Sequence, residues 1–152
     1  MRGTAIIDAY MTTQKPTFVL DNSVTMAWFF EDEKTPYTEN VGYTIARRGA
    51  YVPSLWYLEV TNSLLNGMRQ KRCHGGAVIR FMDDLRSFPI ITDNQTDTRA
   101  FNLIFTLARE YNLTAYDASY LELAMRRGLP LATLDEKLKN AAKEAGVKVY
   151  VD

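Results

Sequence analysis

The sequence predicts an α/β fold in which helices cover both faces of a parallel sheet. Short apolar runs recur along the chain and alternate with amphipathic segments, whose apolar residues follow helical spacing. Short buried strands separated by helices are typical of parallel sheets, because the crossover connections place helices on both faces. The 152 residues, 47% of them hydrophobic and 24% charged, suffice for one domain with its own core.

Residues 1–16 stand apart from this pattern. They are rich in Thr, follow no structural period and end at Pro16. We therefore expect a flexible N-terminal arm here, followed by a single domain over residues 17–152.

Two strands and four helices are expected in the first half of the domain. Ser23 and Ser54 are suitable helix N-caps. Pro36 suits the first position of a helix, and Gly49 suits its end. Gly75–Gly76 interrupts the chain before the fourth helix. In order, the expected elements are a strand at 18–20, helices at 23–30 and 36–48, a strand at 51–52, and helices at 54–71 and 77–87.

Three strands and three helices are expected in the second half. Asp97 is a suitable N-cap. Four apolar residues then follow helical spacing, namely Phe101, Ile104, Ala108 and Tyr111. In order, the expected elements are a strand at 90–92, helices at 97–111 and 114–128, a strand at 131–134, a helix at 136–145 and a strand at 147–151. Both halves together predict a five-stranded parallel sheet.

Charge and cysteine content exclude some classes of protein. The net charge is zero, because 18 basic residues balance 18 acidic ones; this argues against a surface wholly devoted to nucleic acid but allows a local basic patch. Cys73 is the single cysteine, so no internal disulfide forms, which fits a reducing compartment. The longest uncharged stretch, 49–58, is too short to span a bilayer. We therefore expect a cytoplasmic protein without a membrane segment.

Two aspartates directly follow predicted strands. Asp21 follows the strand at 18–20, and Asp135 follows the strand at 131–134. In open parallel sheets, ligands bind at the carboxyl ends of the strands, so both aspartates are candidates for a functional site. Both are also suitable helix N-caps. This alternative is weaker for Asp21, because Ser23 already supplies a cap, and it stays open for Asp135.

Asp117 and Glu59 are two further candidates, each with a structural alternative. Asp117 comes three residues after Thr114, and this spacing also predicts a capping box at the helix start. The two roles are compatible, because the first helical turn lies near the ligand crevice. Glu59 and Asn62 belong to a polar stripe along an otherwise apolar helix. Such a stripe is usually exposed to solvent, but it also suits a pocket in which polar groups find partners.

Four carboxylates close together require a compensating charge. Two carboxylates about 4–5 Å apart repel by roughly 3–4 kcal/mol at an effective dielectric constant of 20, so the group must take up protons or enclose a cation. Oxygen ligands without paired His or Cys suit Mg²⁺ or Mn²⁺ and disfavour Zn²⁺. Such an ion orients phosphate oxygens and lowers the pKa of a bound water. Spacing alone does not establish that these carboxylates cluster.

Four segments of the chain occur in an order that resembles a known family. They are Phe18–Ser23 (FVLDNS), Leu58–Leu64 (LEVTNSL), Thr114–Ala124 (TAYDASYLELA) and Leu131–Asp135 (LATLD). Together they resemble the PIN-domain family, and most closely the VapC-type ribonuclease toxins of toxin–antitoxin pairs. The resemblance extends from about residue 17 to residue 151 and implies three layers around a five-stranded parallel sheet.

The resemblance also implies roles for individual residues. Asp21 and Asp117 match direct ligands of a catalytic Mg²⁺ or Mn²⁺. Glu59 and Asp135 would complete the acidic quartet, directly or through water, and position the attacking water. The positions that match supporting residues are Asn62 and Thr133.

Activity and partners follow from the same resemblance. Members of the family are metal-dependent endoribonucleases that hydrolyse RNA phosphodiester bonds, usually in a tRNA or rRNA loop. They are silenced by a cognate VapB-type antitoxin and commonly form homodimers. A catalytically silent PIN-like module that binds RNA or protein is the main alternative; loss of an acidic residue would indicate it, and none is lost. Phosphoryl transfer through an aspartyl phosphate is a weaker alternative, because Ser23 stands where a second Asp is expected.

Basic and aromatic residues give two further candidate surfaces. Arg69, Lys71 and Arg72 could contact RNA phosphates. Alternatively, they complement the helix dipole and stay solvated, as do Arg126–Arg127 at another predicted helix end. The segment 26–30 holds more aromatic surface than one short helix usually buries, which suits either the core or a groove for an antitoxin or a second copy.

Overall fold

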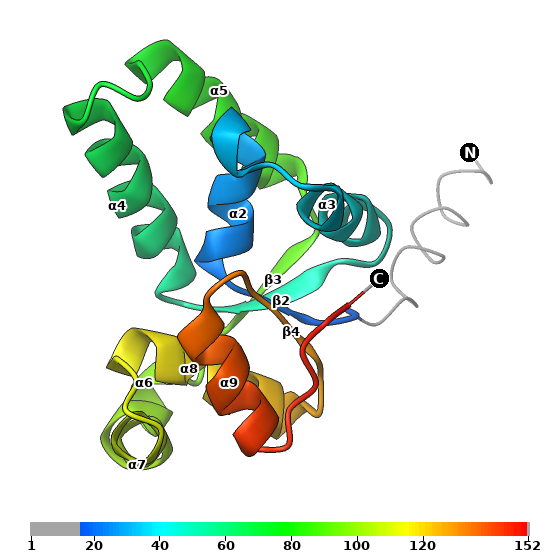
Figure 1. The fold of residues 1–152 in the computed structure, drawn as a ribbon, viewed down its shortest axis with the longest axis vertical. Coiled ribbons are helices and arrows are strands. Elements are labelled where there is room, and N and C mark those ends of the chain that lie inside the picture. Colours follow the sequence, from blue (N-terminus) through cyan, green and yellow to red (C-terminus); the bar gives the residue numbers. More distant parts are fainter. Residues whose placement is uncertain (1–15, 152) are drawn as a thin grey trace, which may run out of the picture.

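The computed structural model describes residues 16–151, which form four strands and a series of helices (Figure 1). The strands are β1 (Val19–Leu20), β2 (Ala50–Pro53), β3 (Ile90–Asp93) and β4 (Leu131–Ala132). The helices before β3 are α2 (Asn22–Phe29), a 3-10 turn η1 (Glu31–Glu33), α3 (Pro36–Arg48), α4 (Trp56–Arg69) and α5 (Gly75–Ser87). Those after β3 are α6 (Thr96–Arg99), a π-helical turn η2 (Ala100–Ile104), α7 (Phe105–Glu110), α8 (Ala115–Arg127) and α9 (Glu136–Glu144).

The strands form one parallel sheet in the order β3-β2-β1-β4. Helices α2 to α5 lie on one side of the sheet and α6 to α9 on the other (Figure 1). The predicted α/β fold, with a parallel sheet flanked by helices, is therefore confirmed. The arm predicted over residues 1–16 lies, apart from Pro16, outside the described residues.

Helices α3 and α8 begin where the sequence predicts. The Thr35 hydroxyl accepts the backbone N–H of Thr38, and Pro36 occupies the first helical position of α3. At the start of α8, the Thr114 hydroxyl accepts the backbone N–H of Asp117. These side chains satisfy backbone N–H groups that have no partner inside the helix.

Three predicted caps are wrong, those at Ser23, Ser54 and Asp97. Asp97 lies inside helix α6, which begins at Thr96 after Gln95. The residue that precedes α2 is Asp21, and the Ser23 hydroxyl bonds to the side chain of Asp21 and to the backbone of Leu134. Helix α4 begins after Leu55, not after Ser54. Ser is favoured at caps because its hydroxyl bonds to nearby backbone groups, but a tertiary partner can take that hydroxyl instead.

The fifth predicted strand, at 147–151, is reduced to a single parallel bridge between Leu131 and Val149. Leu131 donates its N–H to the Lys148 carbonyl and accepts the N–H of Tyr150, both at 2.9 Å. Since β4 is only two residues long, it offers this segment no further pairs. The described sheet therefore has four strands, not five.

The helix predicted over 97–111 contains the π turn η2 in its middle. The spacing placed Phe101 and Ile104 on one face, but Phe101 is 99% exposed and Ile104 only 3%. A π turn is closed by i→i+5 hydrogen bonds and holds one residue more than an α-turn, so it changes which residues share a face. The inward residues of this segment include Ile104 and Leu107.

The core lies on both faces of the sheet. Both residues of β1 are fully buried, as are Val24 and Leu121 on opposite sides. Within the aromatic segment 26–30, Met26 and Phe30 are buried in this core. Among residues 16–151, no helix is long and apolar enough to cross a membrane.

Candidate active site

Two acidic residues lie at the carboxyl ends of the central strands, and a buried threonine joins them. Asp21 follows β1, and Thr133 and Asp135 follow the neighbouring β4. The Thr133 hydroxyl donates to Asp21 Oδ2 at 2.7 Å and accepts the backbone N–H of Asp135 at 3.0 Å. Thr133 is fully buried, so its hydroxyl has little freedom to choose other partners. It ties the ends of two adjacent strands together beneath the site.

Ser23 is a second hydroxyl that holds the Asp21 carboxylate. It donates to Asp21 Oδ2 at 2.6 Å and accepts the backbone N–H of Leu134 at 2.9 Å. Both hydroxyls therefore donate to the same carboxylate oxygen, and the backbone N–H of Ser23 also donates to this carboxylate. Asp21 is thus fixed in orientation at the strand edge.

The first turn of α8 carries Asp117 beside this strand edge. Its backbone N–H bonds to the Thr114 hydroxyl at 3.0 Å, which secures the helix start. The pKa of the half-buried Asp117 carboxyl is raised to about 6. Burial is the largest cause, and the negative charges of Asp21 and Asp135 add to it. The capping geometry and a place in the acidic site are therefore compatible, as the sequence suggested.

Glu59, in the first turn of α4, is held by a residue from the opposite layer. The Tyr120 hydroxyl of α8 donates to Glu59 Oε1 at 2.6 Å. Tyr120 is fully buried, and burial raises the pKa of its hydroxyl well above 10, so it remains a hydrogen-bond donor. Burial also raises the pKa of Glu59 to about 7, against the opposing effect of the Tyr120 bond; the charges of Asp21 and Asp117 add to the rise.

Each of the four carboxylates lies within electrostatic reach of at least two of the others. Asp21 feels the charge of Asp135, Asp117 feels those of Asp21 and Asp135, and Glu59 feels those of Asp21 and Asp117. Burial is the main cause that raises the pKa of Asp21, which is 5% exposed, and the Ser23 and Thr133 hydrogen bonds oppose it. None of the four carboxylates forms an ion pair with any residue in 16–151. Lys137 is close enough to lower the pKa of Asp117, but its effect is smaller than that of burial and the neighbouring carboxylates, so the group keeps an excess of negative charge.

The donor chemistry of this group fits a hard divalent cation, although the chain does not hold a finished coordination shell. All four side chains offer carboxylate oxygens, the ligands preferred by Mg²⁺ and Mn²⁺. Asn22 Oδ1, next in the chain to Asp21, is a buried oxygen without a hydrogen-bond partner. No three acidic, His or Cys side chains within the described range are placed to hold a metal ion between them. A cation bound here would therefore need small movements of the carboxylates toward it.

Several candidates from the sequence lie away from this group. Asn62 is exposed. It is Ser63, the next residue along α4, that contacts the segment after Asp21, by accepting a hydrogen bond from the side-chain amide of Asn22 at 3.0 Å. Arg69 lies at the far end of α4, ten residues from Glu59, or about 15 Å along the helix axis.

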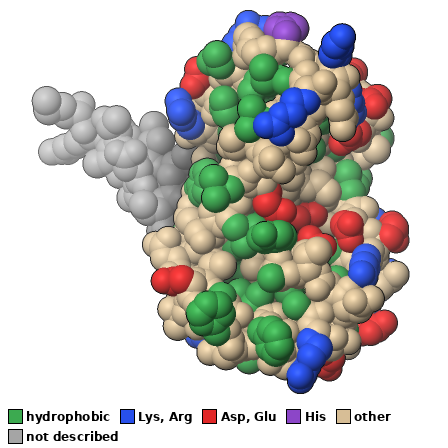
Figure 2. Space-filling view, turned by 90° about the vertical axis from the view of Figure 1, so that its left-hand side faces the viewer, with side chains coloured by type: hydrophobic (Ala, Val, Ile, Leu, Met, Phe, Trp, Pro, Cys, Tyr) green, Lys and Arg blue, Asp and Glu red, His purple; other side chains and the backbone are tan. Residues whose placement is uncertain are grey.

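Lys71 and Arg72 follow Arg69 beyond the end of α4. Arg72 pairs with Asp32 and Glu33 and lies over the ring of Phe30. Basic side chains at this end of the molecule are separated from the central acidic group (Figure 2).

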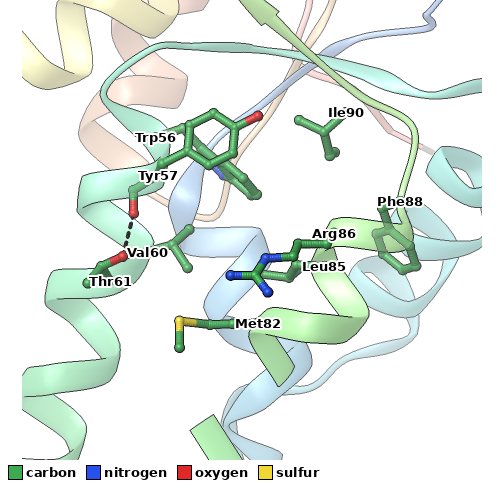
Figure 3. A pocket seen from close by; sticks show the side chains of 9 residues that line it. All are labelled: Trp56, Tyr57, Val60, Thr61, Met82, Leu85, Arg86, Phe88 and Ile90. Atoms are coloured by element: carbon green, nitrogen blue, oxygen red, sulfur yellow. Dashed lines mark hydrogen bonds between the residues drawn. The ribbon is translucent and has the colours of Figure 1, made fainter. Parts of the chain in front are cut away.

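The cavity between α4, α5 and β3 is distinct from the acidic group (Figure 3). It has a volume of about 350 Å³, and none of the four carboxylates lines it. Its lining is mainly apolar, from Trp56 on α4 to Leu85 on α5, with Arg86 as its charged member. The carboxylate group offers metal-ligand chemistry and this cavity does not.

Sequence reasoning missed two residues of the site, Ser23 and Tyr120. Ser23 was interpreted as a cap, although a hydroxyl two residues after a strand-end Asp can also bond to that Asp. Tyr120 gave one signal: it follows Asp117 by three residues, so both lie on the same side of α8. Only the structure shows that its hydroxyl reaches Glu59 across the site.

Comparisons with known proteins agree with this geometry. No curated protein matches the chain. A solved structure described as "Crystal structure of PAE2754 from Pyrobaculum aerophilum" is similar, with a TM-score of 0.62 and 26% sequence identity over 84% of this chain and 86% of that one. The PIN-domain family model matches residues 18–144, which include all four carboxylates. The chain therefore belongs to the PIN-domain family.

Proposed function

We propose that this protein is a Mg²⁺- or Mn²⁺-dependent endoribonuclease that hydrolyses RNA phosphodiester bonds. The observation that carries the proposal is the group of four carboxylates at the carboxyl edge of the sheet, each of which repels at least two others, with raised pKa values for three of them. Unpaired buried charge is costly, so such a group needs a compensating cation. The PIN-domain family includes metal-dependent nucleases, which agrees with this chemistry.

In this proposal, the chain supplies ligands and fixes their orientation. Asp21 and Asp117 bind the ion, and Glu59 and Asp135 complete its surroundings directly or through water. Thr133 and Ser23 fix the orientation of the Asp21 carboxylate, and the Tyr120 hydroxyl holds one oxygen of Glu59. An ion held by these residues would offset the charge of the phosphate and lower the pKa of a water molecule bound to it.

The proposal is tested by cleavage of a total RNA pool with purified protein and Mn²⁺. We expect cleavage to stop with EDTA and to fall at least about 100-fold in Asp21→Asn and Asp117→Asn, because each loses a charged ligand. Asp84→Asn, which neutralises an exposed carboxylate on α5, is the matched control and should cleave like the unmodified protein. Mapping of the cleaved 5′ ends would identify whether the target is a tRNA or rRNA loop.

A second measurement separates metal binding from activity. Mn²⁺ should raise the melting temperature of the protein, because an ion that binds only the folded state stabilises it. Asp21→Asn should abolish this shift and Asp84→Asn should keep it. RNA left intact while the shift persists would favour a catalytically silent binding module. Absence of both would overturn the metal site itself.

We also propose that the chain is the toxin of a toxin–antitoxin pair, inhibited by a VapB-type antitoxin and active as a homodimer. The support is the order and spacing of the four VapC-like segments. Expression should arrest growth, and co-expression of a small protein encoded next to its gene should relieve the arrest. If Asp21→Asn arrests growth equally well, toxicity does not come from the proposed nuclease site.

A further inference from the structure

An apolar hollow adjoins the acidic group, because the segments that carry Glu59 and Asp117 supply part of its wall. Its volume is about 380 Å³, within the range of about 300–1,000 Å³ typical of pockets that hold small ligands. Leu55 and Tyr116 belong to this wall. The Leu55 carbonyl accepts the backbone N–H of Glu59 at 3.0 Å, and Tyr116 directly precedes Asp117. A ligand in the hollow would therefore border the proposed nuclease site.

Three exposed aromatic side chains line the hollow. Phe101 is 99% exposed, Tyr116 is 62% exposed and Phe105 is 58% exposed. Hydrophobic side chains gather beneath the acidic group on this face of the molecule (Figure 2). Exposed apolar side chains that lie together usually mark a binding surface. The hollow therefore offers aromatic rings to a ligand beside the carboxylates.

The charge of the hollow indicates which part of a nucleic acid could enter it. The residues that line it within the described range carry no charged side chain, so they suit an uncharged aromatic group and offer nothing to a phosphate. Beside the hollow, the Arg109 guanidinium lies 5.7 Å from the centre of the Phe105 ring and forms no ion pair with a residue in 16–151. This cation is available to a phosphate outside the hollow.

The position of the other basic side chains leaves a role for such a hollow. Arg69, Lys71 and Arg72 lie away from the acidic group, and Arg72 already pairs with Asp32 and Glu33. The net charge of the chain is zero. A strand of RNA at the acidic group would therefore need contacts other than a broad basic surface. Stacking of bases on aromatic rings supplies such contacts without positive charge.

We propose that the hollow binds an unpaired base of the RNA substrate, next to the bond that is cleaved at the acidic group. The bases of single strands stack on aromatic side chains, and Phe101 and Tyr116 would provide these surfaces. A base inside a duplex is stacked and paired, so it reaches such a pocket only when it is flipped out. The inference rests on the proposed function, because it makes the bound strand the substrate of the carboxylates.

The first experiment measures binding of a short oligoadenylate labelled with fluorescein, by fluorescence anisotropy of the full-length protein in EDTA, where the proposed cleavage stops. A second strand carries the same phosphates but has abasic sites in place of its bases. We expect the unmodified protein to bind the intact strand about tenfold more tightly than the abasic one. Pairing of the intact strand with oligouridylate should remove this advantage, because the bases are then held in a duplex.

Variants of the aromatic residues test the hollow itself. Phe101→Ala and Tyr116→Ala should each weaken binding of the intact strand about tenfold and leave binding of the abasic strand unchanged, because each removes a stacking surface and no charge. Tyr116→Phe keeps the ring and should bind like the unmodified protein. Tyr43→Ala, a matched change at an exposed tyrosine of α3, should have no effect. Circular dichroism of each variant controls for folding.

Two outcomes in EDTA would overturn the inference. One is equal binding of the intact and abasic strands by the unmodified protein. The other is unchanged binding of the intact strand by both Phe101→Ala and Tyr116→Ala; a changed molecular mass of these variants in light scattering would then assign the hollow to a protein partner.

Cleavage assays with Mn²⁺ separate this inference from the proposed function. Binding that depends on the bases and on Phe101, without cleavage of any RNA, would support the hollow and contradict the nuclease. Cleavage at an unchanged rate in both Phe101→Ala and Tyr116→Ala, at RNA concentrations below KM, would support the nuclease and overturn the hollow.

Discussion

Two groups of acidic side chains lie at the carboxyl ends of strands in this protein, and their surroundings are opposite. Asp93 ends β3, is 2% exposed and accepts hydrogen bonds from Arg126 at 2.8 and 3.1 Å and from Arg127 at 2.9 Å. Arg126 also binds the buried Glu122 at 2.8 Å. In contrast, Asp21 and Glu59 accept hydrogen bonds from hydroxyl groups, and Asp135 accepts the backbone N–H of Leu138 as the N-cap of α9. None of these carboxylates forms an ion pair with a residue in 16–151.

The pKa values follow these surroundings. Burial raises the pKa of Asp93, but the hydrogen bonds from Arg126 and Arg127 outweigh it and lower the value to about 2. The pKa of Glu59 rises to about 7, because burial and neighbouring carboxylates act in the same direction. Burial alone therefore does not distinguish a structural acid from a functional one; the presence of a neutralising partner does.

The largest expected effect comes from breaking the neutralised group. Asp93→Asn leaves Arg127 without its carboxylate and Arg126 with Glu122 alone, so we expect the free energy of unfolding to fall by about 3 kcal/mol. Urea denaturation measures this change. Asp83→Asn, which removes an exposed pair with Arg86, is the control and should cost less than about 1 kcal/mol. Equal effects would mean that the Asp93 group is not a structural ion pair.

A smaller effect is expected when acid protonates the same group. The pKa of Asp93 is lowered from its ordinary 3.8 to about 2 in the folded protein. Its contribution to stability is therefore fully present above about pH 4 and is lost as the pH falls through 2, by about 2 kcal/mol in total. Urea denaturation between pH 5 and pH 2 measures this slope. Asp93→Asn should flatten it, and an unchanged slope in this variant would contradict the assignment.

The smallest expected effect has the opposite sign. Without metal, Asp21→Asn should raise the free energy of unfolding by about 1 kcal/mol, because it removes a buried charge from a repelling group. The amide oxygen can accept the Ser23 and Thr133 hydroxyls that now share Oδ2. Urea denaturation in EDTA, with Asp84→Asn as a neutral control, measures the difference. A destabilised variant would make Asp21 a structural acid like Asp93.

The features that could be predicted from the sequence are those set by residues close together along the chain. Asp21 and Asp135 could be placed because each follows an apolar run, and parallel strands bring such positions to one edge. Thr114 could be identified as a cap because its partner lies three residues away. These predictions use only spacing between near neighbours, and that information is complete in the sequence.

The rest depends on contacts between distant parts of the chain. Arg126 and Arg127 were interpreted as solvated ends of a helix, because nothing near them in the sequence points to Asp93, 33 and 34 residues away. Phe101 was placed on the inner face because a π turn leaves no clear mark in an apolar sequence. The shortened last strand follows from the two-residue length of β4, which its apolar run 131–134 did not reveal.

The π turn at Ala100–Ile104 also bears on how this protein can change during evolution. An extra residue in a regular helix would rotate everything beyond it by about 100°. Here the insertion is confined to one turn, so α7 and α8 can keep their packing on the sheet. Loss of one residue within this turn would restore an ordinary helix and retract the exposed aromatic ring. The exposure of this aromatic ring can therefore be gained or lost by a single-codon insertion or deletion, while Asp117 stays at the sheet edge.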